Sequence, residues 1–191
     1  MSLKYFAVAA CFAAAPLAAQ RTVVVNLNGG GYTHLSNLNA SGAPTADFKP
    51  GYNFGASVGV ELTRFVALHG DFTFAHAMAR GASSFTGGDI HRLFYGAHVE
   101  LRYPMESGVT PFAFVGGGAV TVDQAHGGSL PTFTKPAGMM GAGFGYLLPR
   151  SRVELFGEGK SLVYKWDQAG FNKTLWDVTY SVGVAYRFDL R

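Results

Sequence analysis

Alternation of apolar with small or polar residues, at a period of two, runs through almost the whole chain and constrains its fold most strongly. From Tyr52 to Leu62 every second residue is apolar, and the segment from Trp176 to Phe188 repeats the pattern. Successive side chains of a β-strand point to opposite faces, so such segments are typical of strands with one apolar face. The sequence therefore predicts an all-β fold.

The alternation recurs in eight segments. We expect strands at residues 22–35, 51–63, 65–78, 90–103, 110–122, 137–148, 152–166 and 174–188. Short connections alternate strictly with long ones rich in Gly, Ser, Asn and Pro, which predicts an antiparallel up-and-down meander with long loops at one end. Within 152–166 the apolar residues change parity, which predicts a β-bulge near Gly157 or Gly159.

Composition narrows the class of protein. The chain has 191 residues, of which 14% are charged, well below the roughly 25% of an ordinary soluble domain. Its net charge of +3 is spread without a basic block, which argues against nucleic-acid binding. The length fits a single domain, which we place at residues 20–191.

The first 19 residues have the features of a secretory signal peptide. Lys4 precedes an apolar stretch that ends in Leu17-Ala18-Ala19, so we expect cleavage after Ala19. Cys11 is the single cysteine and lies in this segment. The remaining chain would then have no disulfide and no thiolate. Acylation of Cys11 is the alternative, since Val8-Ala9-Ala10-Cys11 resembles a lipoprotein processing box.

The two faces of the strands differ in a way that favours a membrane. One face is mostly Gly, Ala, Ser, Thr and Asn, with too few charges for a water-facing surface, and small residues suit the narrow bore of an eight-stranded barrel. We expect the other face to be apolar and to contact lipid. It would carry Tyr52, Phe54, Phe72, Phe74, Tyr95, Phe112, Phe114, Phe144 and Val184.

Aromatic residues gather near the ends of the expected strands, where amphipathic rings lie at membrane interfaces. The expected interface aromatics are Tyr52, Tyr103, Tyr146, Trp166, Trp176, Tyr186 and Phe188. A strand crosses a bilayer in about 9–11 residues, so the expected strands are long enough. A closed barrel would also satisfy every backbone group in hydrocarbon.

With these features the chain resembles the small outer-membrane β-barrels of the OmpA and OmpX type. The most specific element is the final strand, Val184-Ala185-Tyr186-Arg187-Phe188, which is similar to the signal such proteins present to the barrel-assembly machinery. Asp189-Leu190-Arg191 follow Phe188, whereas a terminal Phe is usual in the family. The resemblance implies an eight-stranded antiparallel up-and-down transmembrane β-barrel. It further implies a monomer in the bacterial outer membrane, in contact with outer-membrane lipids and lipopolysaccharide. No peptidoglycan-binding domain is implied.

Charged residues on the inward face are nearly balanced in sign. The expected lumen polar network contains Glu61, His69, Asp71, Arg92, His98, Glu100, Arg102, Glu154, Glu158, Lys160 and Arg187. Strand symmetry predicts three cross-strand pairs: His69 with Glu100, Asp71 with His98, and Glu154 with Arg187. Because unpaired buried charges are costly, we expect these groups to plug the lumen. A small or gated channel is the alternative.

Catalysis and metal binding are not predicted. The six histidines, His34, His69, His76, His91, His98 and His126, lack the close spacing of a zinc signature, and no cofactor is expected. A lipid-modifying hydrolase could use Ser and His on the lipid-facing wall, and the candidates are His34 with Ser36 and His126 with Ser129. The sequence indicates no acidic partner for His34. A secreted soluble barrel that carries a ligand is a further alternative.

The long loops are natural contact surfaces on a rigid barrel, although their composition identifies no ligand. Their expected apolar tips are Leu38, Phe85, Phe133 and Phe171. Lys49, Arg80, Lys135 and Lys173 fall near the outer rim, where the phosphates of lipopolysaccharide could meet them. The sequence thus predicts a barrel with a structural or surface-interaction role.

Overall fold

The computed structural model describes residues 22–36, 47–80, 89–125, 132–167 and 172–189, and the structural statements below concern these residues. The strands are β1 (Thr22–His34), β2 (Asp47–Phe48), β3 (Gly51–Thr63), β4 (Val66–Arg80), β5 (Asp89–Arg102), β6 (Val109–Ala125), β7 (Phe133–Leu147), β8 (Val153–Trp166) and β9 (Lys173–Asp189). All eight predicted strands are confirmed within a few residues. The two-residue β2, which pairs with the end of β4, was not predicted.

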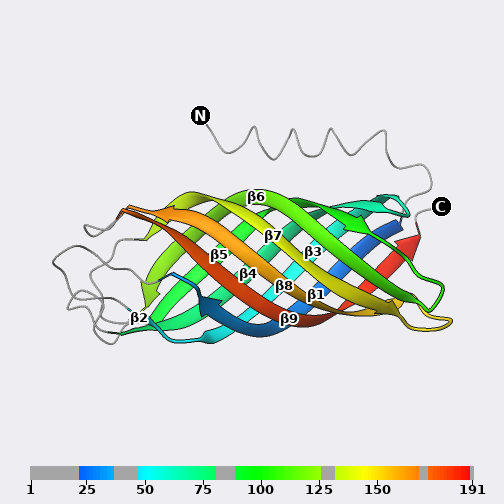
Figure 1. Ribbon diagram of the computed structural model, residues 1–191, viewed down its shortest axis with the longest axis horizontal. Coiled ribbons are helices and arrows are strands. Elements are labelled where there is room, and N and C mark those ends of the chain that lie inside the picture. The colour runs from blue at the N-terminus through cyan, green and yellow to red at the C-terminus, as the bar shows by residue number, and fades with distance from the viewer. Residues whose placement is uncertain (1–21, 37–46, 81–88, 126–131, 168–171, 190–191) are drawn as a thin grey trace.

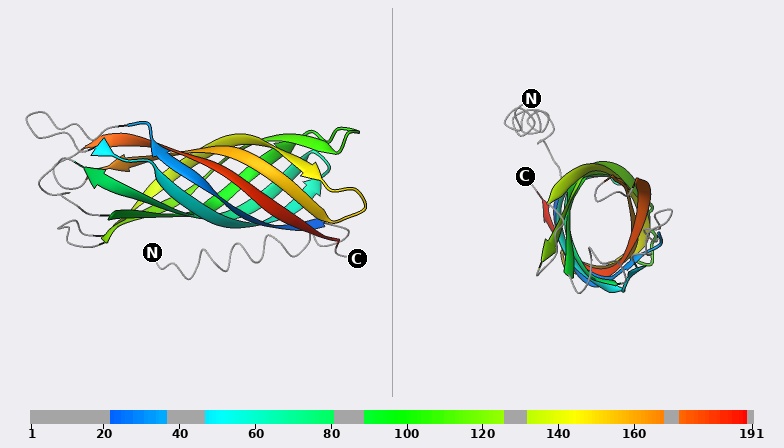
Figure 2. Two further views of the ribbon diagram at one scale, coloured as in Figure 1. Left: turned by 90° about the horizontal axis from the view of Figure 1, so that it is seen from below. Right: turned by 90° about the vertical axis from the view of Figure 1, so that its left-hand side faces the viewer.

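The strands close into an antiparallel barrel (Figure 1). Each long strand pairs with its neighbours along the chain, while β9 pairs with β1 and so joins the two ends of the sheet. Viewed along its axis the sheet is a closed ring (Figure 2). The short connections lie at the end of the barrel where β1 begins and β9 ends, which we call the turn end. We call the opposite end the loop end. The described residues contain no helix that is both long and apolar enough to cross a membrane, a finding that does not bear on β-barrels.

Large apolar side chains cover the outside of the barrel. Leu27, Val115, Phe144 and Val182 are each more than 60% exposed, and they come from four different strands. An apolar surface this extensive would be an aggregation liability in water, whereas hydrocarbon suits it. The apolar face predicted from the alternation therefore lies on the exterior.

Phe112 and Phe114 were predicted on the exterior, and this was wrong. Both rings point into the barrel and are 8% and 5% exposed. Gly143 and Gly141 on β7 leave the space they fill, because a Cβ at either glycine would lie 2.6 or 2.4 Å from the ring of Phe112 or Phe114. Small and large residues on adjacent strands thus share the narrow bore.

The predicted bulge near Gly157 or Gly159 is also absent. β8 pairs with β7 and β9 without a register shift, and its even-numbered residues face inward from Glu154 to Trp166. The parity change in the sequence arises because inward residues are polar near the turn end and apolar near the loop end. A register shift does occur between Glu61 and Thr63, where β3 pairs with β4.

Val182→Arg should separate a lipid-facing exterior from a water-facing one. Val182 lies in the middle of β9 and is 72% exposed, so an arginine there would meet the centre of the bilayer and lower the free energy of unfolding by roughly 2–4 kcal/mol. The measurement is urea unfolding in lipid vesicles, followed by tryptophan fluorescence. Phe188→Arg, near the turn end, is the control and should cost about 1 kcal/mol or less. Equal effects at both positions would contradict a lipid-covered wall.

Candidate functional site

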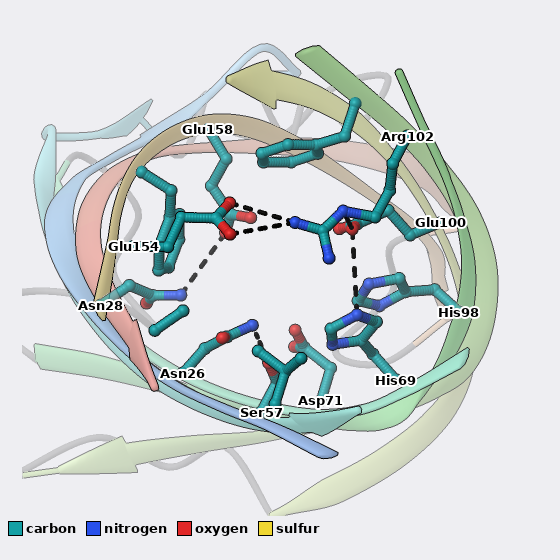
Figure 3. Close-up of a pocket in the computed structure, with 14 residues that line it drawn as sticks. Asn26, Asn28, Ser57, His69, Asp71, His98, Glu100, Arg102, Glu154 and Glu158 are labelled. Atoms are coloured by element: carbon teal, nitrogen blue, oxygen red, sulfur yellow. Dashed lines mark hydrogen bonds and ion pairs between the residues drawn. The ribbon is translucent and has the colours of Figure 1, made fainter. Parts of the chain in front are cut away.

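The inward-facing charged residues form the candidate site, and Figure 3 shows several of them pointing into the bore. Ten of the eleven expected members take part in ion pairs, and the eleventh, His98, stacks on His69. The members are Glu61, His69, Asp71, Arg92, His98, Glu100, Arg102, Glu154, Glu158, Lys160 and Arg187. Strand parity and closure direct all of them into the lumen.

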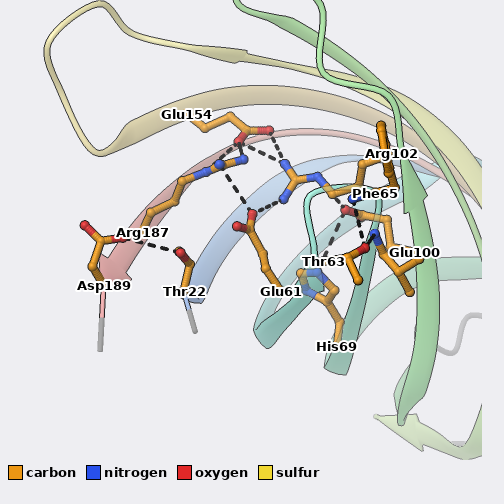
Figure 4. Close-up of polar contacts among 11 residues, drawn as sticks. Thr22, Glu61, Thr63, Phe65, His69, Glu100, Arg102, Glu154, Arg187 and Asp189 are labelled. Atoms are coloured by element: carbon orange, nitrogen blue, oxygen red, sulfur yellow. Dashed lines mark hydrogen bonds and ion pairs between the residues drawn. The ribbon is translucent and has the colours of Figure 1, made fainter. Parts of the chain in front are cut away.

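Arg102 is the centre of the turn-end network, which crosses the bore (Figure 4). Its Nη1 lies 2.5 Å from Glu61 Oε1, and its Nη2 donates to both oxygens of Glu154 at 3.1 Å. Arg187 approaches the same two carboxylates, at 2.5 Å from Glu154 and 3.4 Å from Glu61. Glu100 Oε1 lies 3.2 Å from Arg102 Nε. Two guanidinium groups and three carboxylates thus connect β3, β5, β8 and β9.

Lys160 holds together a second polar group, near the middle of β8. Its Nζ lies 3.0 and 2.9 Å from the two oxygens of Asp71 and 3.0 Å from Thr73 Oγ1. Glu158 Oε1 is 3.7 Å from Lys160 Nζ and accepts a hydrogen bond of 3.5 Å from Asn28 Nδ2. Because Lys160 and Asp71 are both buried, each ion depends on the other for its stability.

Asp177 organises a third group toward the loop end that sequence reasoning missed. It accepts hydrogen bonds from the hydroxyls of Tyr32 at 2.7 Å and Tyr164 at 2.9 Å. Arg92 Nε lies 3.4 Å from Asp177, and His34 Nδ1 is in direct contact with the same carboxylate. Asp177 has the parity of Thr179 and Ser181 in β9, so the alternation already placed it inward, and that signal could have identified it.

Trp166 was predicted at the membrane interface, and this was wrong. Its side chain is fully buried in the lumen near the loop end, where its ring meets Phe133 edge-on at 4.9 Å. Phe133 was expected at a loop tip but is the first residue of β7. The bore is therefore filled by apolar groups beyond Asp177.

The other six expected interface aromatics are on the exterior and are at least 39% exposed: Tyr52, Tyr103, Tyr146, Trp176, Tyr186 and Phe188. They come from both ends of the barrel. Several expected features lie outside the described residues: the signal peptide with Cys11, the loop residues Leu38, Phe85, His126, Ser129 and Phe171, and the last two residues.

The pairing expected between β4 and β5 is displaced by two residues. His69 lies opposite His98 and Asp71 opposite Gly96, so neither expected partner is directly across. Glu100 still approaches His69, at 3.9 Å between Oε1 and Nε2. The pair of Glu154 with Arg187, in contrast, forms as expected. The prediction assumed that β4 and β5 pair symmetrically about the loop between them. Such an assumption gives the face on which a residue lies but not the residue opposite it.

His34 and Ser36, the hydrolase candidates, do not lie together on the lipid-facing wall. The His34 side chain faces the lumen and is 2% exposed, with Asp177 as the acidic partner that the sequence did not indicate. Ser36 Oγ accepts a hydrogen bond from the backbone N–H of Trp176 at 3.2 Å. A carboxylate does orient His34, but burial removes it from the acyl chains that such an enzyme would act on.

Cations expected at the outer rim lie at or beside the strand ends. Lys135 forms an ion pair of 2.5 Å with Asp167, just beyond β8. This hydrogen bond, together with the positive charge of Lys135, lowers the pKa of the exposed Asp167 carboxyl. Lys49 is partly exposed, Lys173 begins β9, and the side chain of Arg80 lies outside the described part of the structure.

Two cavities lie among the polar side chains of the turn-end half of the barrel. A cavity of about 30 Å³ is lined by polar groups of the turn-end half, among them Asn26, Asp71 and Glu154 (Figure 3). That volume holds one or two waters. A second cavity, of about 190 Å³, opens at the turn end beside Arg64 and Arg187.

Solved structures similar to this one are small outer-membrane barrels. Neisserial surface protein A has a TM-score of 0.63 at 15% identity, covering 88% of this chain and 97% of its own. OprG of Pseudomonas aeruginosa has a TM-score of 0.56 at 14% identity, covering 89% and 96%. Ail of Yersinia pestis has a TM-score of 0.54 at 15% identity, covering 88% and 99%. At such identities the likeness shows a shared fold alone.

A comparison with curated protein sequences gave no match. The family described as "Outer membrane protein beta-barrel domain" matches residues 5–188, which is nearly the whole chain. This family places the protein in the bacterial outer membrane. The chain belongs to the outer membrane protein beta-barrel domain family.

Proposed function

We propose that the protein is an integral outer-membrane barrel with a structural or surface-interaction role, whose lumen its own side chains plug. The observation that carries this proposal is the size of the internal cavity, about 30 Å³. A conducting pore needs a continuous path for water and ions. The bore instead contains the turn-end network, the Lys160–Asp71 pair and the apolar group around Trp166, one after another.

Reconstitution in planar bilayers tests the plug. We expect the purified wild-type barrel to give no steady conductance, because ion-paired and apolar side chains fill the bore along its length. A general porin, purified and inserted in the same detergent, is the control for successful insertion. Steady conductance well above the bilayer baseline from the wild type would overturn the plug and favour the channel alternative.

A surface-interaction role is supported by the position of the long connections. The strands that these connections join all end at the loop end of a barrel with paired strands all around, and loops on a rigid scaffold are common sites of binding. Among the neighbours, one is named a surface protein and another an attachment invasion locus protein, solved with a heparin analogue. We propose contact of this kind for the loop end of the present chain.

The proposed partners follow from the two ends of the barrel. Tyr186 and Phe188 both lie on the exterior of β9, which supports recognition of this strand by the barrel-assembly machinery. Lys49, Lys135 and Lys173 lie near the loop end, where phosphates of lipopolysaccharide would meet them. The barrel has no unpaired long strand edge, which supports a monomer. We propose no catalytic activity, since His34 is buried away from lipid.

A further inference from the structure

We propose that His69, His98 and Glu100 form a binding site for a divalent transition-metal ion, with Zn²⁺ as its representative, inside the barrel. One ligand atom from each residue can be chosen so that all lie within 4.8 Å of one another. His69 on β4 lies directly opposite His98 on β5, and Glu100 follows two residues later on the same face of β5. Two imidazoles and one carboxylate are a donor set that binds zinc in proteins.

The ring nitrogens of these two histidines are available to bind a metal ion. His69 is 2% exposed, and neither of its ring nitrogens has a hydrogen-bond partner among the described residues. His98 Nδ1 is likewise buried, with no such partner in the described part of the chain. Buried polar atoms are nearly always hydrogen-bonded or bound to water or an ion. A bound metal would take up one nitrogen of each ring.

The neighbouring strands provide space for the two rings. The imidazoles of His69 and His98 are stacked, with centroids 5.0 Å apart and an angle of 4° between their planes. Gly59 lies opposite His69, and a Cβ there would come within 2.4 Å of its ring. On the other side, a Cβ at Gly116 would lie 2.6 Å from His98 Cβ. Glycines on both flanking strands therefore accommodate the pair.

The adjoining cavity can complete the coordination. All three proposed ligands line the cavity of about 30 Å³, which has room for one water. Zinc commonly takes three protein ligands and a water, with Zn–N and Zn–O bonds of about 2.0–2.2 Å. His69 Nε2 and Glu100 Oε1 are 3.9 Å apart, and the stacked rings of His69 and His98 would turn out of their parallel arrangement to direct a nitrogen each at one ion.

Nearby cations do not exclude an ion here, because each has other carboxylates. Arg102 contacts Glu100 but donates its hydrogen bonds to Glu61 and Glu154. Lys160 is bound to Asp71, which also lines the cavity. Arg102 lines both this cavity and the larger one at the turn end. The turn-end mouth, past Arg102, is therefore the route by which an ion would enter.

Titration of the refolded full barrel in detergent micelles with Zn²⁺, by calorimetry, tests the site. We expect one ion per chain, and loss of at least about tenfold in affinity in His69→Ala and His98→Ala. The matched control is His76→Ala/His91→Ala, which removes a second cross-strand histidine pair of the same two strands, with ring centroids 5.2 Å apart. This pair lies on the outward face, and its removal should leave the affinity unchanged.

Two results would overturn the proposal. The first is that the wild type binds no Zn²⁺. The second is that both lumen variants, His69→Ala and His98→Ala, still bind Zn²⁺ with the affinity of the wild type while the outward-face control loses it. If a lumen variant fails to fold, as judged by loss of heat-modifiable gel mobility, crystals of the wild type grown with Zn²⁺ decide. An anomalous peak at the zinc edge between His69 and His98 supports the site. A peak elsewhere only, or none, overturns it.

Discussion

Replacing Arg102 with methionine should lower the free energy of unfolding of the barrel by roughly 3–5 kcal/mol. Arg102 contacts three carboxylates, those of Glu61, Glu100 and Glu154. Methionine fills a similar volume without the charge, so the carboxylates lose a shared cation while their side chains stay largely buried. The measurement is equilibrium unfolding in urea with the barrel in lipid vesicles, read from tryptophan fluorescence.

Arg152→Met is the control for this prediction. Arg152 also pairs with a carboxylate, Asp189, at 3.2 Å, but the two side chains are 55% and 57% exposed. Exposed ion pairs contribute about 1 kcal/mol or less, so the control should change stability little. If Arg102→Met were as mild as Arg152→Met, the turn-end network would not stabilise the barrel, and its role in closing the lumen would lose its physical basis.

Lys160→Met should have an effect of similar size, roughly 3–5 kcal/mol, because it leaves Asp71 buried without its cation. Lys160 Nζ lies 2.9 Å from Asp71 Oδ2, and both residues are buried in the bore. Unlike Arg102, this lysine has Asp71 as its single hydrogen-bonded carboxylate among the described residues. Glu158, at 3.7 Å, is a more distant ionic partner of the same lysine.

The double variant Lys160→Met/Asp71→Asn tests that reasoning with the same unfolding measurement. Removing both charges eliminates the uncompensated ion, so the double variant should be more stable than Lys160→Met alone. The single variant Asp71→Asn gives the reference. If adding Asp71→Asn to Lys160→Met lowers the free energy of unfolding by as much as Asp71→Asn does alone, the two charges are independent. The ion pair would then not be the reason for the cost of the single change.

The metal ligands illustrate a site that no spacing rule could identify. His69 and His98 are far apart in the sequence and meet because β4 pairs with β5 in one particular register. The symmetric pairing expected from the sequence was displaced by two residues, a shift that keeps every side chain on its face but changes each partner. For this reason the sequence indicated lumenal histidines without indicating that two of them stack.

The apolar lining of the bore shows a second limit of the sequence. Phe112 and Phe114 were expected to face lipid and Trp166 to lie at the membrane interface, yet all three fill the lumen. In β6 the run Pro111-Phe112-Ala113-Phe114-Val115 is apolar at every position, so alternation does not distinguish its faces. The deciding features are glycines on the next strand, which only the paired sheet brings opposite the rings.

The sequence alone determined the number of strands, their approximate bounds, the antiparallel order and the inward face of charged residues such as Arg102 and Lys160. These follow from local chemistry, since the side-chain period of a strand and the residues of turns are written along the chain. Tertiary structure decided which groups meet: the carboxylates around Arg102, Asp177 with Tyr32 and Tyr164, and His69 beside His98. Those contacts depend on the register and closure of the whole sheet, to which every strand contributes and which no single segment encodes.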